Sequence, residues 1–300
     1  MTAHGPIVVT GASGFVGRAL VARLGARCDA LHLAPDDWRE RIRGANFSGA
    51  TVFHLAARVH STANDEAPFL RDNRDKTRAL AQAAARGGAR RLVFVSSSRA
   101  MGEETGARPF TLDDVPHPVD AYGRSKLAAE QAIAEVARST ALEYAVVRAP
   151  LVLGGGAKGN LVALLRICDS PWPLPFGAPA NCRSFVQVDD LARLLVLCAE
   201  RPIAAGRTYL AAHRTALSTR DLVASIRSAL GRAPRLFALP ASALERLGAI
   251  AGRGDAVRRL TRSLELDPSL AERELGWRAE VSLDAAVREM VAAYRAQAAR

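Results

Sequence analysis

The 300-residue sequence has few aromatic residues and no long uninterrupted apolar run. Aromatic residues make up 5% of the chain, and this scarcity counts against a surface that stacks nucleic-acid bases. The longest apolar stretches, such as residues 194–199, fall far below the roughly 18 residues of a membrane-spanning helix. We therefore expect no membrane span.

Cysteine is also scarce, and its placement argues against two kinds of site. The cysteines form no C-x-x-C pair and have no neighbouring histidine at the spacing of metal ligands, so we expect free thiols and no metal. An apolar run and a glycine turn already occupy residues 7–17, which leaves no room for a signal peptide before them. The sequence therefore predicts a cytoplasmic protein. The cysteines are Cys28, Cys168, Cys182 and Cys198.

Positive charge is in excess, with 41 Lys and Arg residues against 30 Asp and Glu residues and a net charge of +11. Such a charge suits polyanionic partners. The arginines, however, are scattered through helical segments such as residues 257–262, with no interleaved aromatic residues. We interpret the excess as a solvated basic surface and expect no nucleic-acid partner.

Apolar runs with strand character alternate with stretches of helical periodicity through about residue 150. Alternating strands and helices are typical of a parallel sheet covered by helices. The expected strands are residues 7–10, 28–33, 51–55, 91–95 and 142–147, and the expected helices are residues 15–24, 67–86 and 121–140.

The pattern changes after Pro150, where glycines and prolines interrupt the regularity. A strand at 184–188 and a helix at 189–200 suggest that the chain returns to the sheet before it ends in helices that include 218–230 and 283–298. We expect an α/β fold, a doubly wound Rossmann parallel sheet with a smaller C-terminal substrate-binding domain. The Rossmann domain would comprise residues 1–150 and 184–212, and the smaller domain residues 151–183 and 213–300.

A glycine motif lies where the first strand turns into the first helix. Residues 10–17 read Thr-Gly-Ala-Ser-Gly-Phe-Val-Gly. Glycine permits the tight turn and the close approach of backbone to a pyrophosphate, and the helix N-terminus attracts the anion. The strand before and the helix after supply the context that the motif requires. The pattern predicts a dinucleotide cofactor held by Gly11, Ser13, Gly14, Phe15, Val16 and Gly17.

A second motif places Tyr122 and Lys126 four residues apart on a predicted helix, so that both side chains share one face. A lysine cation beside a phenol lowers the pKa of the phenol, which then serves as a general acid or base for an alcohol. Three serines, residues 96–98, follow the fourth strand at the edge where open α/β sheets bind ligands. A hydroxyl there can hydrogen-bond the reacting oxygen.

Together these motifs resemble the extended short-chain dehydrogenases/reductases, in particular the NAD-dependent epimerase/dehydratase branch that acts on nucleotide sugars. Residues 10–17 are similar to its T-G-x-x-G-x-x-G, residues 54–57 to its H-x-A-A, and residues 91–102 to its strand ending in S-S-x-x-x-x-G. Asn73 with Thr77 resembles its central-helix asparagine pattern. The resemblance implies NAD as cofactor, with NADP still open, and extends the cofactor contacts to Leu55, Ala56, Ala57, Asn73, Tyr122 and Lys126.

The resemblance also assigns catalytic and substrate-binding residues. Counting back from Gly102 makes Ser97 the catalytic hydroxyl beside Tyr122 and Lys126. The second half of the chain continues the match, because residues 148–150 resemble the R-x-P after the sixth strand and residues 183–190 resemble R-x-F-x-x-V-x-D. By this likeness Ser97, Asn160 and Arg183 contact a UDP-sugar, and Arg258 or Arg259 matches a later phosphate-binding arginine. The smaller domain would then bind the nucleotide sugar.

Some positions depart from the pattern or stay unassigned. Met101 stands where many relatives have a tyrosine, so a contact from that hydroxyl is absent. Asp36 and Asp37 are the candidates for holding the ribose of NAD, although they follow Pro35. We interpret His54 as a structural residue. Arg58 and His60 lead into a loop and receive no role.

The residues also narrow the reaction. In dehydratase relatives an Asp-Glu pair follows the catalytic hydroxyl, whereas Ser98 and Arg99 stand here, which argues against dehydration. A UDP-hexose 4-epimerase working through a 4-keto intermediate is the favoured prediction. The alternatives are an NAD(P)H-dependent 4-ketoreductase of a UDP-4-keto-6-deoxy-hexosamine, a dehydrogenase of a non-nucleotide alcohol, and a non-catalytic dinucleotide sensor or assembly protein.

Two further expectations follow from the resemblance. Residues 173–177 and 275–277 resemble a bacterial subgroup associated with polysaccharide biosynthesis. Relatives often dimerise through the helix that bears the catalytic tyrosine, so a homodimer is left open.

Overall fold

The computed structural model describes residues 5–25, 28–33, 36–59, 66–157 and 159–298. Its centre is a six-stranded sheet in the order β2-β1-β3-β4-β5-β8, and every neighbouring pair is parallel. Helices cover both faces, so the strands read as continuous apolar runs rather than as an alternating pattern. The strands are β1 (Ile7–Thr10), β2 (Cys28–Leu31), β3 (Thr51–His54), β4 (Arg91–Ser97), β5 (Glu143–Ala149) and β8 (Arg207–Leu210).

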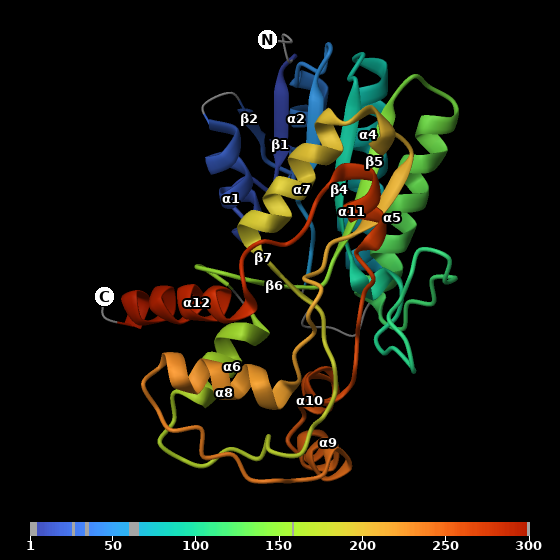
Figure 1. The fold of residues 1–300 in the computed structure, drawn as a ribbon. Coiled ribbons are helices and arrows are strands. Elements are labelled where there is room, and N and C mark those ends of the chain that lie inside the picture. The colour runs from blue at the N-terminus through green and yellow to red at the C-terminus, as the bar shows by residue number, and fades with distance from the viewer. Residues whose placement is uncertain (1–4, 26–27, 34–35, 60–65, 158, 299–300) are drawn as a thin grey trace.

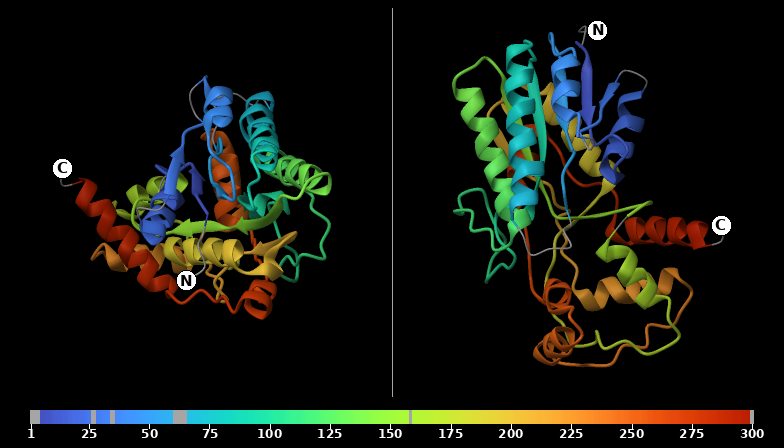
Figure 2. Two further views of the ribbon diagram at one scale, coloured as in Figure 1. Left: turned by 90° about the horizontal axis from the view of Figure 1, so that it is seen from above. Right: turned by 180° about the vertical axis from the view of Figure 1, so that it is seen from behind.

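Two helical layers enclose this sheet, as Figures 1 and 2 show from the front, from above and from behind. On one face Leu20 and Leu195 pack with Trp277 in a shared apolar core. On the other face Leu80 and Ile133 pack against the strands. The first layer contains α1 (Phe15–Leu24), α7 (Val188–Glu200) and α11 (Ser269–Leu275), and the second contains α2 (Trp38–Gly44), α4 (Lys76–Arg86) and α5 (Ala121–Arg138). This is the doubly wound α/β fold that the sequence predicts.

A smaller group of helices lies below the carboxyl ends of the strands (Figure 1). Its own apolar core includes Leu164, Val223 and Met290. A two-stranded parallel sheet, β6 (Leu151–Leu153) with β7 (Phe185–Gln187), lies between this group and the central sheet. The helices are α6 (Asn160–Cys168), α8 (Thr219–Ala229), α9 (Ala241–Ile250), α10 (Gly254–Thr261) and α12 (Leu283–Ala298).

Backbone pairing joins the two parts of the molecule. Thr105 and Phe110, which follow β4, donate backbone hydrogen bonds to Ser263 and Glu265 in the segment after α10. On the other side of that segment, Ser184 donates to the carbonyl of Leu264. The segment after α10 is therefore held between the β4–α5 connection and the approach to β7.

The structure corrects several expected elements. The strand expected at 184–188 forms as β7 but pairs with β6, and the strand that rejoins the central sheet is β8. Hydrophobic pattern identifies a strand without naming its partner. The helix expected at 67–86 consists of α3 (Ala67–Phe69), a π-helical stretch η2 (Leu70–Asp75) and α4. Helix α2 was not predicted, because seven residues offer too little periodicity.

Short turns complete the architecture. A 3-10 turn, η3 (Ser98–Ala100), follows β4, and another, η4 (Pro202–Ala204), precedes β8. Within the described part of the chain, no helix combines the length and the apolar character needed to cross a membrane. Nor do the described residues include a cluster of three His, Cys, Asp or Glu side chains that could hold a metal ion.

Candidate functional site

The glycine turn between β1 and α1 forms a cradle that has no room for larger residues. A Cβ atom on Gly11 would lie 2.7 Å from the backbone nitrogen of Ala56, and Gly11 has a φ of 71°. A Cβ atom on Gly17 would lie 2.1 Å from the carbonyl oxygen of Gly11. Gly14 caps α1 without a side-chain hydrogen bond, so the first N–H groups of the helix are not bonded to a capping side chain. These features fit a dinucleotide pyrophosphate.

The other predicted cofactor residues lie beside this turn. Leu55 and Ala56 donate backbone hydrogen bonds to the Thr10 hydroxyl at 3.2 and 3.3 Å, which fixes the end of β3 against the turn. Ala57 follows in the same half-buried stretch. Phe15 and Val16 are half-buried in the first turn of α1, and Ser13 is exposed.

His54 is a buried structural residue, as expected. Its Nδ1 lies 2.6 Å from the Thr10 hydroxyl and its Nε2 lies 2.7 Å from the Thr77 hydroxyl. Burial, aided by the charge of Lys126, lowers the pKa of the imidazole to about 3. Both ring nitrogens are occupied, so the side chain links β1, β3 and α4 rather than exchanging protons with a ligand.

Ser97 and Tyr122 meet at the carboxyl end of β4. Ser97 is the last residue of β4, Tyr122 lies in the first turn of α5, and the Ser97 hydroxyl is near enough to the phenol to lower its pKa. The ring of Phe69 packs edge-on against the phenol at 6.3 Å between centroids. Two hydroxyls that could act on a substrate alcohol thus come from residues 25 positions apart in sequence. They lie at the edge of the sheet where open α/β folds bind ligands.

Lys126 does not act on Tyr122 in the way expected from the four-residue spacing. Its Nζ is buried, donates to the carbonyl oxygen of Val95 at 2.6 Å and lies 4.0 Å from the Phe94 ring centroid. Burial lowers the pKa of this amine to about 7, against an opposing effect of Glu130. The pKa of Tyr122 is raised, because burial outweighs the lowering effects of Arg99 and then Ser97. Lys126 is therefore not among the groups that lower the pKa of the Tyr122 phenol, contrary to the expectation from the four-residue spacing.

Asn73 lies within the π-helical stretch η2, and π-helical segments are frequent at functional sites. Its buried amide donates to Ser125 Oγ at 2.9 Å and to the carbonyl of Arg58 at 3.0 Å, and its oxygen accepts from the Arg58 backbone nitrogen at 2.7 Å. The Arg58 side chain pairs with Asp72 at 2.6 Å. Asn73 therefore ties the segment after β3 to the helix that bears Tyr122 and Lys126.

Three arginines converge beside the Ser97–Tyr122 pair. Burial first and the charge of Arg259 second lower the pKa values of Arg99 and Arg183 to about 10 each. Asp120 and Glu103 lie between Arg99 and Arg259, with Asp120 Oδ2 3.5 Å from Arg259 and Glu103 Oε1 3.1 Å from Arg99. The Nε atoms of Arg99 and Arg259 are buried, and neither has a hydrogen-bond partner among the described residues.

These arginines come from different parts of the chain, and the sequence located only some of them. Arg183 precedes β7, Arg259 lies in α10 and Arg99 lies in η3. The sequence predicts a phosphate-binding role for Arg183 and for either Arg258 or Arg259. It assigns Arg99 no binding role and shows only that Arg99 stands where dehydratase relatives have an acidic residue. The signal for Arg99 was its position two residues after Ser97, at a strand end that binds ligands.

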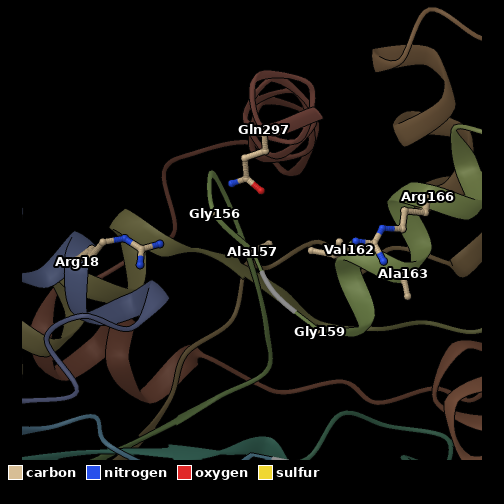
Figure 3. A pocket seen from close by; sticks show the side chains of 8 residues that line it. All are labelled: Arg18, Gly156, Ala157, Gly159, Val162, Ala163, Arg166 and Gln297. Atoms are coloured by element: carbon tan, nitrogen blue, oxygen red, sulfur yellow. The ribbon is translucent and has the colours of Figure 1, made fainter. Parts of the chain in front are cut away.

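Asn160 begins α6 and is exposed. The preceding residue, Gly159, lines a cavity of about 400 Å³. Figure 3 shows Arg18 of α1 and Arg166 of α6 on opposite sides of the loop that carries Gly156, with Gln297 of α12 nearby. Ser97, Tyr122 and Lys126 do not line this cavity. It borders the glycine turn, because Arg18 donates to the carbonyl of Ser13 at 2.9 Å.

The remaining candidates have diverse surroundings. Asp37 pairs with Arg41 at 2.8 Å, and Asp36 is exposed. Met101 is buried against Arg148, which forms a buried ion pair with Glu130. Pro35 and His60 lie outside the described residues.

Comparisons with known proteins identify the family of the chain. Residues 7–212 match the model of a family described as "NAD dependent epimerase/dehydratase family". The chain is 30% identical over 311 residues to a UDP-glucose 4-epimerase of Vibrio cholerae, covering 96% of this chain and 95% of that protein. It is 32% identical over 225 residues to a dTDP-4-dehydrorhamnose reductase of Mycobacterium tuberculosis, covering 71% of each.

Solved structures give the same result. The structure titled "MoeE5 in complex with UDP-glucuronic acid and NAD" superposes with a TM-score of 0.78 and 25% identity, covering 98% of this chain and 100% of that one. The family model covers residues 7–212, and the relative from Vibrio cholerae and this solved structure each match nearly the whole chain. The chain belongs to the NAD dependent epimerase/dehydratase family of extended short-chain dehydrogenases/reductases and is an NAD(P)-dependent enzyme.

Proposed function

We propose that the protein is a UDP-hexose 4-epimerase that works through a 4-keto intermediate. The observation that carries the proposal is the placement of Ser97 and Tyr122 at the carboxyl end of β4, near Arg183, whose pKa burial lowers, and Arg259, whose Nε is buried without a partner among the described residues. A hydroxyl pair suits oxidation and reduction of an alcohol, and forked guanidinium groups suit a diphosphate. A nucleotide diphosphate sugar contains both groups.

The chain's own residues would divide the work. Tyr122 would take the proton from the sugar C4 hydroxyl and return it later, while Ser97 would hydrogen-bond the same oxygen. When bound, the nicotinamide would accept a hydride and give it back. Lys126, whose Nζ is fixed by its hydrogen bond to the Val95 carbonyl, would contact the cofactor and could gain or lose a proton near neutral pH.

The diphosphate would be bound by the smaller part of the molecule. We propose residues 151–183 and 213–300 as the nucleotide-sugar domain, except that α11 packs on the central sheet, and residues 1–150 with 184–212 as the cofactor domain. Asn160, Arg183 and Arg259 are the proposed diphosphate contacts. Arg183 and Arg259 approach the Rossmann part closely enough to interact with Arg99 and Glu103. The Vibrio cholerae relative and the UDP-bound structure support a UDP-sugar.

A 4-ketoreductase is the second candidate, because a dTDP-4-dehydrorhamnose reductase is among the relatives at 32% identity. The same hydroxyl pair would protonate a 4-keto sugar, and the cofactor would be consumed rather than regenerated. A UDP-4-keto-6-deoxy-hexosamine is the substrate we would test for this reaction.

One experiment separates the two. The purified protein is denatured and its supernatant analysed for NAD(H) and NADP(H), and the native protein is incubated with UDP-glucose and UDP-N-acetylglucosamine without added cofactor. An epimerase releases bound cofactor and forms the galacto epimer. A reductase turns over only when NAD(P)H and the 4-keto sugar are both supplied.

Substitution tests the assigned residues. We expect Tyr122→Phe to lower turnover by roughly 100- to 10,000-fold, the usual contribution of a general acid–base group. Lys126→Ala should also lower it. Turnover of all tested UDP-sugars that is unchanged in both variants would rule out the proposed roles.

A further inference from the structure

Four large apolar side chains are exposed at the end of the smaller helical group that lies farthest from the central sheet. Trp172 follows α6, Phe237 precedes α9, and Leu247 and Ile250 lie on α9. Water reaches 73% of Trp172 and 85% of Ile250. The segments that carry them, residues 171–179 and 231–240 together with α9, form the lower edge of the molecule in Figure 1 and in the right panel of Figure 2. The apolar core of this group is formed by other side chains.

Backbone pairing and helix packing fix the segments that carry these side chains. Leu174 donates a backbone hydrogen bond to the carbonyl of Arg235 at 3.0 Å, and Phe237 donates to the carbonyl of Leu174 at 3.0 Å. The buried guanidinium of Arg227 donates to the carbonyl of Trp172 at 3.1 Å. The opposite face of α9 packs against α10. The exposed apolar side chains therefore project from paired segments and from a packed helix.

Exposed arginines accompany the apolar side chains. Arg235, Arg246 and Arg253 each lie within three residues of Phe237 or of the exposed apolar side chains of α9. Within the described part of the chain, no carboxylate pairs with these three, whereas the other four arginines of residues 231–262 are paired. We call the four apolar side chains and the three unpaired arginines the distal surface.

The chemistry of the distal surface matches that of an anionic bilayer. Tryptophan, phenylalanine and leucine side chains enter the boundary between lipid headgroups and acyl chains, and flanking arginines bind the phosphate groups. A second copy of this chain fits the surface poorly, because a two-fold contact would bring the same unpaired arginines together. A lipid surface supplies both the apolar layer and the negative charge that this end of the molecule leaves unmatched.

We propose that the distal surface binds an anionic bilayer, with its apolar side chains in the interface and its arginines on lipid phosphates. Each arginine at an anionic membrane surface strengthens binding roughly fivefold. The net charge of +11 on the whole chain adds an attraction of longer range. The distal surface includes none of the residues assigned to catalysis or to the diphosphate, so binding there does not depend on the proposed function.

Cosedimentation with vesicles tests the proposal on the full-length protein. One set of vesicles contains phosphatidylcholine alone, and the other contains phosphatidylcholine with phosphatidylglycerol. We expect binding to the anionic vesicles only, and we expect it to weaken as salt rises from about 0.1 M to about 1 M, where charges are screened within a few ångströms. Protein that remains in the supernatant with anionic vesicles at low salt would overturn the proposal.

A pair of double variants locates the binding. Arg246→Gln with Ile250→Ala removes one charge and one apolar side chain from the distal surface, and we expect vesicle binding to fall by about tenfold. Arg201→Gln with Ile203→Ala makes the same change beside the amino end of β8, at the opposite end of the sheet from the smaller helical group, and should leave binding unchanged. Equal effects of the two double variants would overturn the proposed location.

Tryptophan fluorescence reports contact with lipid without any substitution. Trp172 is exposed, whereas Trp38 and Trp277, the other two tryptophans of the chain, are buried. We expect anionic vesicles to shift the emission of the wild type to shorter wavelength. The variant Trp172→Phe should still bind and should lose the shift. Vesicle binding with no change in emission would contradict entry of this side chain into the interface.

A second copy of the chain is the other occupant to test. Light scattering gives the mass in solution of the wild type and of the Arg246→Gln, Ile250→Ala double variant. We expect the two masses to agree. An oligomer of the wild type that the double variant dissociates would assign the distal surface to a contact between copies and overturn the proposal.

Discussion

At the scale of single residues, the site contains cations that are wholly or partly removed from water. Lys126 is enclosed by β4 and α5 with one carbonyl partner, and Arg183 and Arg259 crowd positive charge beside one another. Burying a charge without full pairing costs free energy. If the site binds a diphosphate and moves a proton as proposed, the unliganded protein carries this cost.

The amine of Lys126 predicts a specific pH dependence of stability. Its pKa falls from 10.5 in the unfolded chain to about 7 in the folded protein. Between these values the unfolded chain binds more protons, so stability should rise with pH through this window, and the cost of the charged amine is fully present below it. We expect Lys126→Met to gain stability over the wild type most at or below pH 7.

Urea denaturation of the wild type and of Lys126→Met across that window checks the prediction. The difference in the free energy of unfolding between the two proteins should shrink as pH approaches 10.5. A constant difference would show that the amine is not titrating near neutral pH.

At the scale of elements, the close contact between α5 and η3 controls the placement of Tyr122. We expect Gly123→Ala to lower both stability and turnover, because its Cβ would lie 2.4 Å from the Arg99 carbonyl oxygen and backbone must move. Overpacking of this kind typically costs about 1–3 kcal/mol. Thermal unfolding and steady-state rates measure the two effects.

Gly44→Ala is the control for that experiment. Gly44 ends α2, has an ordinary negative φ and would place its Cβ in open space. We expect unchanged or slightly higher stability there. Equal behaviour of the two alanine variants would contradict the importance of the α5–η3 contact.

At the scale of the whole molecule, the two parts meet through charge as well as through backbone pairing. Arg183, ahead of β7, and Arg259, on α10, face Arg99 and Glu103 of the Rossmann part. A diphosphate bound between them would offset this repulsion. Ligand binding should therefore stabilise the junction of the two parts.

We expect UDP to raise the thermal unfolding temperature of the wild type, because a ligand at 100 times its Kd stabilises a protein by about 2.7 kcal/mol. Arg183→Met should raise the unfolding temperature of the unliganded protein, since it removes a half-buried charge that is repelled by Arg259, and should diminish the response to UDP. Differential scanning fluorimetry with a UDP series gives both quantities.

The surface variant Arg288→Met is the comparison for Arg183→Met. Arg288 is exposed and pairs with Asp284 on α12, so its loss should change neither the unliganded stability by more than about 1 kcal/mol nor the response to UDP. An undiminished UDP response in Arg183→Met would place the diphosphate elsewhere.

The sequence by itself determined the α/β class, the glycine cradle and the helix face that carries Tyr122, because these depend on local chain geometry. The family resemblance singled out Ser97 among the three serines. A strand, a turn without side chains and a helix specify where the cradle lies, and four-residue spacing specifies one helix face. The family resemblance extended this to Arg183.

Only the tertiary structure decided which strand rejoins the sheet, which carbonyl accepts the Lys126 hydrogen bond and which cation faces the phenol. These outcomes depend on groups far apart in sequence: β8 pairs with β5, Lys126 bonds Val95, and Arg99 meets Tyr122. Sequence spacing fixes the direction of a side chain along its own helix. Burial and the charges on neighbouring elements fix what that side chain meets and which protonation state it prefers.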